Sequence, residues 1–220
     1  NGLQTKLWVD VNGNDTEDSG DQVTTYTYGT TKGTGAGDSS IATGYLLQKE
    51  TYPDSPPSST TDFVTHAHNA LGQEMWRKDQ SSNIVQSDFD TAGRLTQKRI
   101  TTLGTGLDSA VLRIGMTYTS RGQTDKVTQY SNATVGSGSV TDEVQYAYDD
   151  WGNVASFTQD VDSAIGGSGR SSFGVSYTYG KATPTGGHDT VRRVTETLPG
   201  SLIEYFNYSN ASSSLADVSS

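Results

Sequence analysis

The chain has 220 residues, with 25 acidic against 15 basic side chains and a formal net charge of −10. This balance argues against binding to nucleic-acid phosphates or to anionic membrane surfaces, and the lack of cysteine excludes disulfides and thiolate metal sites. Only 31% of the residues are hydrophobic, which argues against a thick core, and no apolar run is long enough to predict membrane insertion.

The first predicted strand covers residues 3–9 and is followed by a polar loop. Four side chains of this loop stand at positions 1, 3, 5 and 9 of a weak calcium-loop pattern: Asp10, Asn12, Asn14 and Asp18. Position 6 of such a loop should be Gly and is Asp15, and position 12 should be Glu and is Asp21. A polar hairpin tip explains the same residues, so the sequence predicts no metal and no cofactor.

A strand over residues 24–28 comes next and brings Tyr26 and Tyr28 to one face. A long tip, 29–44, separates it from a return strand over 45–52. Pro53, Pro56 and Pro57 then end the pairing, because proline cannot donate to a β ladder.

Four hairpins with a shared pattern follow, each with an aromatic or His four positions before a Gly. Strict alternation precedes each anchor, as in Val144, Tyr146 and Tyr148, which is typical of half-buried strands. Two later strands, 175–179 and 204–208, have the alternation without the Gly. The chain has 12 Tyr, 5 Phe and 3 Trp, too many aromatics for a disordered chain. We expect these anchors to form a ladder on one sheet face: Tyr26, Tyr28, His68, Phe89, Tyr118, Tyr146, Tyr148, Tyr177, Tyr179, Phe206 and Tyr208.

The residues after each anchor predict a tight turn. An Asp or Asn caps the turn with its side chain, and a Gly three residues later supplies the positive φ that reverses the chain. Thr119 is a weaker cap in the third hairpin. The remaining predicted turn residues are Asn69, Gly72, Asp90, Gly93, Gly122, Asp149 and Gly152.

Other chemistry is weakly indicated. His66 and His68 share a strand face that suits a metal, but no local acidic or Cys ligand accompanies them, and both fit ladder positions. No serine or carboxylate pair has a catalytic setting, so we predict that the chain is not an enzyme. Four aromatics lie outside the ladder or at tips, where they either stack on sugars or cover a neighbouring hairpin: Trp76, Tyr130, Trp151 and Phe157.

The fold class expected from these elements is all-β. One array of sequential antiparallel β-hairpins over residues 1–220 would form a curved or spiralling repeat sheet, as a segment of a longer repeat protein or assembly. A single hairpin cannot bury its own face, so neighbouring repeats or self-association must cover it.

The repeated unit resembles the RHS or YD repeat. Residues 148–154 read Tyr-Asp-Asp-Trp-Gly-Asn-Val, and residues 89–95 read Phe-Asp-Thr-Ala-Gly-Arg-Leu. The spacing is longer than the family's usual 20 or so residues, and no Asp-Pro-x-Gly core segment or toxin end is found. This resemblance implies a β shell or fibre that encloses toxin cargo or scaffolds a bacterial surface, in a secreted or cell-surface protein. The alternative is an adhesion module whose aromatic and acidic tips bind glycans.

Overall fold

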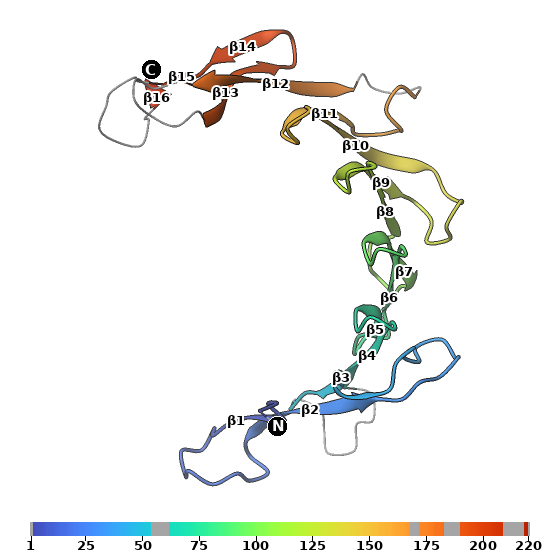
Figure 1. The fold of residues 1–220 in the computed structure, drawn as a ribbon. Coiled ribbons are helices and arrows are strands. Elements are labelled where there is room, and N and C mark those ends of the chain that lie inside the picture. Colours follow the sequence, from blue (N-terminus) through green and yellow to red (C-terminus); the bar gives the residue numbers. More distant parts are fainter. Residues whose placement is uncertain (1, 54–61, 168–171, 183–189, 209–217, 220) are drawn as a thin grey trace. The chain divides into compact units, whose positions relative to one another are not determined.

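The computed structural model describes residues 2–53, 62–167, 172–182, 190–208 and 218–219, and all regular elements there are strands. This confirms the all-β hairpin prediction. In this described part, no helix has the length and hydrophobicity to cross a membrane. The strands, labelled in Figure 1, are β1 Lys6–Val9, β2 Gln22–Thr30, β3 Thr43–Thr51, β4 Phe63–His68, β5 Glu74–Lys78, β6 Ile84–Phe89, β7 Leu95–Thr102, β8 Arg113–Tyr118, β9 Thr124–Tyr130, β10 Val140–Tyr148, β11 Val154–Asp160, β12 Phe173–Ala182, β13 Thr190–Leu198, β14 Leu202–Tyr205, β15 Asn207–Tyr208 and β16 Val218–Ser219.

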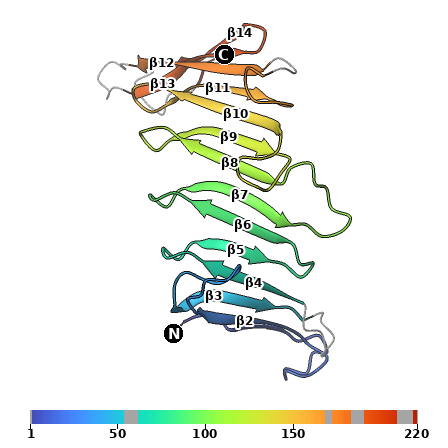
Figure 2. The same cartoon turned by 90° about the vertical axis from the view of Figure 1, so that its right-hand side faces the viewer.

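The chain divides into two compact units, one of residues 1–114 and 131–138 and the other of residues 115–130 and 139–220. In the first unit β1 to β7 pair in sequence order, each antiparallel to the next. In the second unit β9 to β14 do the same. Figure 2 shows β2 to β7 side by side and, in the second unit, β10 to β12. The hairpins therefore pair with their sequence neighbours. A single array over residues 1–220 stays a prediction.

Strand β12 shows why the sequence alternates. Val175, Tyr177 and Tyr179 are half-buried, whereas Gly174 and Ser176 on the other face are exposed. Side chains two residues apart point to the same side of a strand, so one face collects the apolar groups. The sheet is one layer thick at this point, as the low hydrophobic content predicts.

A β-bulge accompanies the anchor in five hairpins. In β10 and β11, Ala147 pairs with Ser156 but Tyr148 pairs with Val154, so Ala155 is the extra residue. The same shift occurs immediately before Tyr28, His68, Phe89 and Tyr179. An extra residue on one strand increases the local twist. The bulges therefore twist each hairpin just before its tip.

The segment 204–208 differs from the single strand that was expected. Strand β14 ends at Tyr205, and β15 begins at Asn207 and pairs with β16 instead of β13. Between them the Phe206 backbone N–H donates to the Val194 carbonyl at 2.8 Å. Val194 is the bulged residue of β13, so its carbonyl accepts this bond outside the regular ladder. Pro56, Pro57 and most of the expected tip at 180–189 lie outside the described residues.

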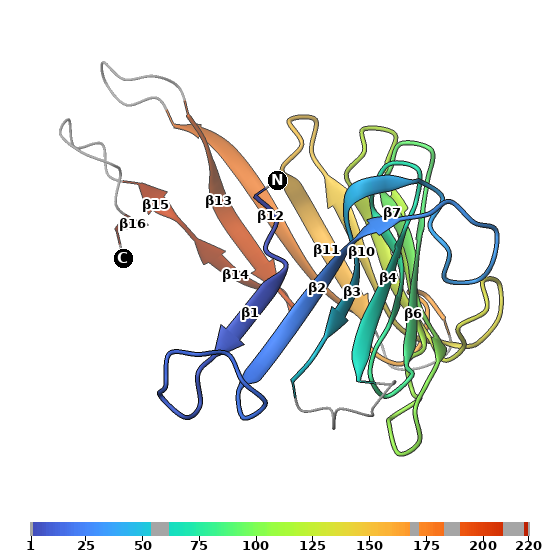
Figure 3. The same ribbon diagram turned by 90° about the horizontal axis from the view of Figure 1, so that it is seen from below.

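In the first unit, a connection folds back over the sheet and buries the residues beneath it. The Ser40 backbone N–H donates to the His68 carbonyl at 2.7 Å, and the Ser39 hydroxyl accepts from the His68 N–H at 3.0 Å. Figures 1 and 3 show this blue connection, between β2 and β3, beside β4. Among the described residues, Val64 and Ala67 of β4 are the buried hydrophobic side chains. The apolar core is therefore very small.

Buried polar groups hold two other connections. In the first unit, Arg113 is 4% exposed, and its guanidinium donates to Gln97 Oε1 and to the carbonyls of Asn132 and Ser137. Residues 131–138 are thus fixed through one side chain. Burying a charged group is unfavourable unless the group is hydrogen-bonded. Arg113 can therefore stay buried only while it keeps these hydrogen bonds.

The second unit has a corresponding carboxylate cluster. Glu143 is 6% exposed and accepts from Lys126 Nζ at 2.9 Å, from the Thr128 hydroxyl at 2.8 Å and from the Ile165 N–H at 3.2 Å. Asp160, its register partner on β11, accepts from the Ser163 N–H and hydroxyl. Burial by itself would raise the pKa of Glu143, but the hydrogen bonds from Lys126, Thr128 and Ile165 together outweigh it and lower the pKa. Both carboxylates therefore hold the connection that follows β11.

Candidate functional site

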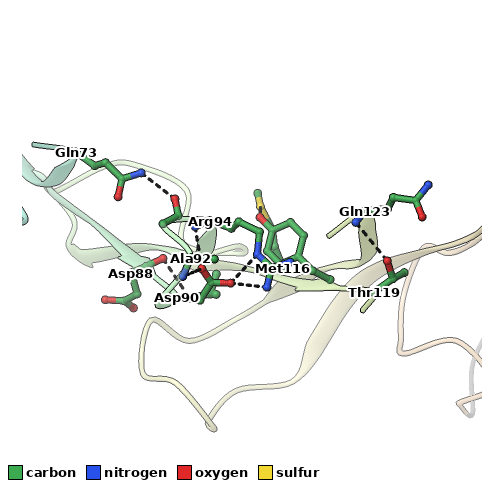
Figure 4. A network of polar contacts seen from close by, with 11 residues as sticks. Gln73, Asp88, Asp90, Ala92, Arg94, Met116, Thr119 and Gln123 are labelled. Carbon is green, nitrogen blue, oxygen red and sulfur yellow. Dashed lines mark hydrogen bonds and ion pairs between the residues drawn. The ribbon is translucent and has the colours of Figure 1, made fainter. Parts of the chain in front are cut away.

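The hairpin tips are the most regular surface feature of the protein. A tip is defined here as the five residues after an anchor: 69–73, 90–94, 119–123 and 149–153. In the tip of Asp90, its N–H donates to the Arg94 carbonyl, and the Gly93 N–H donates to the Asp90 carbonyl, both at 2.9 Å. Asp90 Oδ1 also accepts from the N–H groups of Ala92 and Arg94 (Figure 4).

The other three tips have the same backbone bonds. Asn69 and Asp149 each cap the third and fifth N–H groups of their tips, whereas Thr119 caps only the fifth. The tip glycines have positive φ in all four: Gly72, Gly93, Gly122 and Gly152. Hydrogen bonds from the Asn153 side chain and from backbone N–H groups lower the pKa of Asp149, so its cap stays ionised. The capping mechanism thus operates in every tip.

A fifth turn of the same kind connects β5 and β6 at residues 79–83, and sequence reasoning missed it. The Asp79 N–H donates to the Asn83 carbonyl, and Asp79 Oδ1 accepts from the Asn83 N–H. Ser82 takes the place of the glycine with φ 64. The Asp four residues before an Asn was the available signal, but the search required a Gly.

This fifth turn gives a matched pair of stability predictions. Gly72→Ala should lower the free energy of unfolding by about 1–2 kcal/mol, because φ 79 is a left-handed conformation that disfavours a Cβ. An added Cβ would meet only Leu46, at an ordinary 3.8 Å, so backbone strain is the expected cause. Ser82→Gly should instead raise the free energy of unfolding by up to about 1 kcal/mol. Gly relieves the backbone strain at this position, but it also makes the unfolded chain more flexible, which offsets part of the gain. Urea denaturation of both variants checks the pair; equal signs would contradict it.

Neighbouring tips are joined by side chains that the pattern did not reveal. Gln73 Nε2 donates to the Gly93 carbonyl at 2.8 Å (Figure 4), and Gln123 Nε2 donates to the Gly152 carbonyl at 3.0 Å. In the second unit, Arg121 Nη1 also donates to the Asp150 carbonyl at 2.9 Å. These lateral bonds hold the tip 69–73 against 90–94 in the first unit and the tip 119–123 against 149–153 in the second.

Two ladder tyrosines make a second kind of lateral bond. The Tyr148 hydroxyl donates to the Thr124 carbonyl at 2.7 Å, and the Tyr179 hydroxyl donates to the Val154 carbonyl at 2.9 Å. Thr124 and Val154 occupy the same place, two residues after a tip glycine. Each tyrosine therefore fastens its hairpin to the return strand of the previous one. Burial raises the pKa of both phenols.

Tyr148→Phe should lower the free energy of unfolding by about 1 kcal/mol, the usual net value of one hydrogen bond. The Thr124 carbonyl would lose this donor while the ring packing stayed. Tyr205→Phe is the control, because Tyr205 is exposed and should change stability little. Equal effects of the two substitutions in chemical denaturation would contradict a role for the Tyr148 hydroxyl.

The aromatic ladder is most continuous in the second unit. Tyr146 and Phe157 have ring centroids 6.5 Å apart, and Phe157 lies at the same distance from Tyr177, so Phe157 belongs to the ladder and not outside it as expected. The Arg193 guanidinium then lies over the rings of Tyr177, at 5.3 Å, and Phe206, at 4.3 Å. These contacts cross four strands, as expected of cross-strand pairs. The side chain of Tyr208 lies outside the described residues.

In the first unit, charged groups take ladder positions. Tyr26 pairs in register with Glu50, and Tyr28 with Leu47. His66 lies between two carboxylates, with Nδ1 2.5 Å from Glu74 Oε2 and Nε2 3.4 Å from Glu50 Oε1. The hydrogen bond with His66 lowers the pKa of Glu74. No group of three or more His, Asp or Glu in the described part of the chain is arranged to hold a metal ion.

His68 should make stability depend on pH. Burial lowers the pKa of His68 because the charged imidazole is poorly solvated. Unfolded His takes up a proton near pH 6.5, where folded His68 still resists it, so the free energy of unfolding should fall as pH drops from about 7.5 to about 5.5. In urea titrations at the two pH values, the His68→Phe variant should lose less of its free energy of unfolding than the unchanged chain. If both lost the same amount, other groups would cause the pH dependence.

The weak calcium pattern forms a loop held by its own hydrogen bonds. Asp10 accepts from the N–H groups of Gly13 and Asp15, and the amides of Asn12 and Asn14 both donate to Asp18 Oδ2 at 2.8 Å. These amides present N–H groups, not oxygens, toward the carboxylate. The Gly20 N–H and the two amides lower the pKa of Asp18. The geometry is that of a polar hairpin tip.

No protein-family model matches the chain, and no curated protein matches it. Parts of several solved structures align with it. The crystal structure of TcdB2-TccC3-TEV aligns over 93% of this chain and 11% of its own, with 13% identity and a TM-score of 0.43. The crystal structure of TcdB2-TccC3 without its hypervariable C-terminal region aligns over 84% and 12%, with 17% identity and a TM-score of 0.32.

A third similar structure is the Tc holotoxin pore of Photorhabdus luminescens, which aligns over 70% of this chain and 8% of its own, with 18% identity and a TM-score of 0.31. The chain thus spans about a tenth of the length of the proteins it resembles. Likenesses of this size carry no conclusion about activity, substrate or partners.

Proposed function

We propose that the chain is a non-catalytic wall segment of a secreted or cell-surface bacterial protein of the RHS or YD-repeat type. Its hairpins would form part of a β shell or fibre that encloses toxin cargo or scaffolds the surface. The observation that carries the proposal is that each hairpin is fastened mainly to its sequence neighbours. Backbone pairing, the Gln73 and Gln123 side chains, and the Tyr148 and Tyr179 hydroxyls all act laterally.

The small core supports the same role. Among the described residues, only Val64 and Ala67 are buried hydrophobic side chains, so the units gain little stability from a compact interior. Stability that comes from nearest neighbours is typical of repeat proteins. A wall can be lengthened by adding hairpins without changing those already present.

The outer strands supply the means of extension. Within the described residues, β1 pairs only with β2, and β14 only with β13. Leu7 and Val9 of β1, and Leu202 and Ile203 of β14, are exposed. An unpaired strand with exposed apolar side chains is a template for another strand. Further repeats, or another copy of this chain, would cover these edges.

Negative-stain microscopy and light scattering of the purified chain test the proposal. We expect concentration-dependent association through the outer strands. Leu7→Lys with Leu202→Lys should reduce it, because charges on edge strands oppose pairing. Tyr45→Lys is the control, because Tyr45 is also an exposed large side chain but lies on β3, which is not an outer strand. Separate monomers at all concentrations, with cooperative folding, would overturn the proposal.

A further inference from the structure

Trp151 differs from the residues in the same place of the other tips. It is the third tip residue, where the other tips have Leu71, Ala92 and Arg121, and it is 80% exposed. We propose that Trp151 and the adjacent groove between two tips of the second unit bind a neutral pyranose ring of a glycan. This goes beyond the structural role proposed above.

Two of the other tips use their fifth residue to contact the next tip, and one of these also uses its third residue. Arg121 and Gln123 both donate to carbonyls of the tip 149–153, and Gln73 donates to Gly93. In the tip 90–94 the fifth residue, Arg94, bonds to Asp90 of its own tip. In the tip 149–153 the fifth residue is Asn153, whose amide donates instead to Asp149 Oδ2 at 2.9 Å. Among the described residues, none accepts a hydrogen bond from the Trp151 indole. Within that part of the chain, the Trp151 indole therefore makes no lateral hydrogen bond.

The backbone beneath Trp151 is held firmly. Asp149 Oδ1 accepts from the N–H groups of Trp151, at 2.9 Å, and Asn153, at 2.8 Å. Arg121 of the preceding tip binds the Asp150 carbonyl at 2.9 Å. A ligand that stacks on the indole would thus meet a platform whose backbone needs no ordering on binding, which reduces the entropic cost.

A groove of about 220 Å³ lies between this tip and the preceding one, and it adjoins Trp151 through the preceding residue, Asp150, which lines it. It is smaller than the roughly 300–1,000 Å³ typical of drug-sized ligand pockets, so it suits one ring and not a long peptide. Ser120, Arg121 and Asp150 are exposed at the groove and offer hydroxyl, guanidinium and carboxylate groups. The lining residues are Thr119, Ser120, Arg121, Gln123, Tyr146, Ala147, Tyr148, Asp149 and Asp150.

This chemistry favours a neutral sugar. A pyranose presents a C–H face that packs on an indole and hydroxyls at its edge that bond to polar side chains; Trp combines an apolar ring face with a polar N–H. The groove lining carries two carboxylates, Asp149 and Asp150, and one cation, Arg121, so its net negative charge would repel an acidic sugar or a phosphate. A neutral hexose or N-acetylhexosamine meets both the apolar and the polar groups.

The test is a titration of the whole 220-residue chain, uniformly labelled with ¹⁵N, against methyl glycosides of neutral hexoses and N-acetylhexosamines and against sialyllactose. We expect a saturable shift of the Trp151 indole signal with at least one neutral glycoside, and not with sialyllactose. The signals of Trp8 and Trp76 should stay unchanged. Trp151→Ala should weaken binding at least about tenfold. Binding to this variant is followed by the amide signals of Gln123 and Tyr148.

Leu71→Ala is the matched control, because Leu71 holds the equivalent place and is 70% exposed. It should leave binding unchanged, whereas Arg121→Ala should weaken it. The proposal is overturned if no neutral glycoside gives a saturable shift, if Trp151→Ala binds as the unchanged chain does, or if sialyllactose binds more tightly. A Trp151 signal that shifts only with protein concentration would indicate a second copy as the occupant, and would also overturn it. None of these results depends on filament or shell formation.

Discussion

Replacing Glu143 with Ala is expected to lower the free energy of unfolding by about 3 kcal/mol, the scale of losing one partner of a buried charge pair. Glu143 accepts three hydrogen bonds, from Lys126, the Thr128 hydroxyl and the Ile165 N–H. Its removal would leave the buried Thr128 hydroxyl without this acceptor and the Lys126 ammonium without its carboxylate. The connection after β11 would also lose its contact with β10.

Urea denaturation followed by circular dichroism measures this effect. Glu204→Ala is the matched control, since it removes the same charge from an exposed position of the same unit. We expect a change within about 0.5 kcal/mol for Glu204→Ala. If both variants lost the same stability, net charge and not the buried cluster would be the cause.

Arg113→Met is expected to cost about 3 kcal/mol in the first unit, because hydrogen bonds to charged groups are stronger than neutral ones and three acceptors lose their donor. Gln97 Oε1 and the carbonyls of Asn132 and Ser137 lie at 3.1, 3.3 and 2.9 Å from the guanidinium. Methionine keeps much of the apolar stem of arginine. The lost stability would therefore come mainly from the three hydrogen bonds.

Two measurements separate local from global effects of Arg113→Met. Denaturation gives the free energy, and amide hydrogen exchange should show faster exchange in residues 131–138. Lys6→Met is the control, since its ion pair with Glu17 is exposed and should contribute less than about 1 kcal/mol. Unchanged exchange in 131–138 would show that Arg113 does not hold this connection.

The order of strands followed from local chemistry. Alternation such as Val144, Tyr146 and Tyr148 predicts a half-buried strand, and an Asp or Asn three residues before a Gly predicts the turn. Both signals depend on residues close in sequence. The turn at 79–83 was missed because the expected pattern has a Gly at the position of positive φ, and in this turn Ser82 adopts that conformation.

The candidate glycan groove was only partly visible in the sequence. Trp151 stood out as an aromatic at a tip, but the sequence favoured the interpretation that it covers a neighbouring hairpin. The groove lies between two tips, where Arg121 contacts the Asp150 carbonyl although the two residues are 29 positions apart. Nothing in the local pattern indicates which tip side chains bond laterally.

By itself, the sequence determined the strand periodicity, the tip chemistry and the up-and-down order of hairpins, because each is set by neighbours within a few residues. Only the tertiary structure decided that Arg113 and Glu143 are buried, that bulges precede the anchors, and that Tyr148 bonds to the previous return strand. The physical reason is that burial and lateral bonding depend on which connection folds over which strand. Local alternation is silent on that choice.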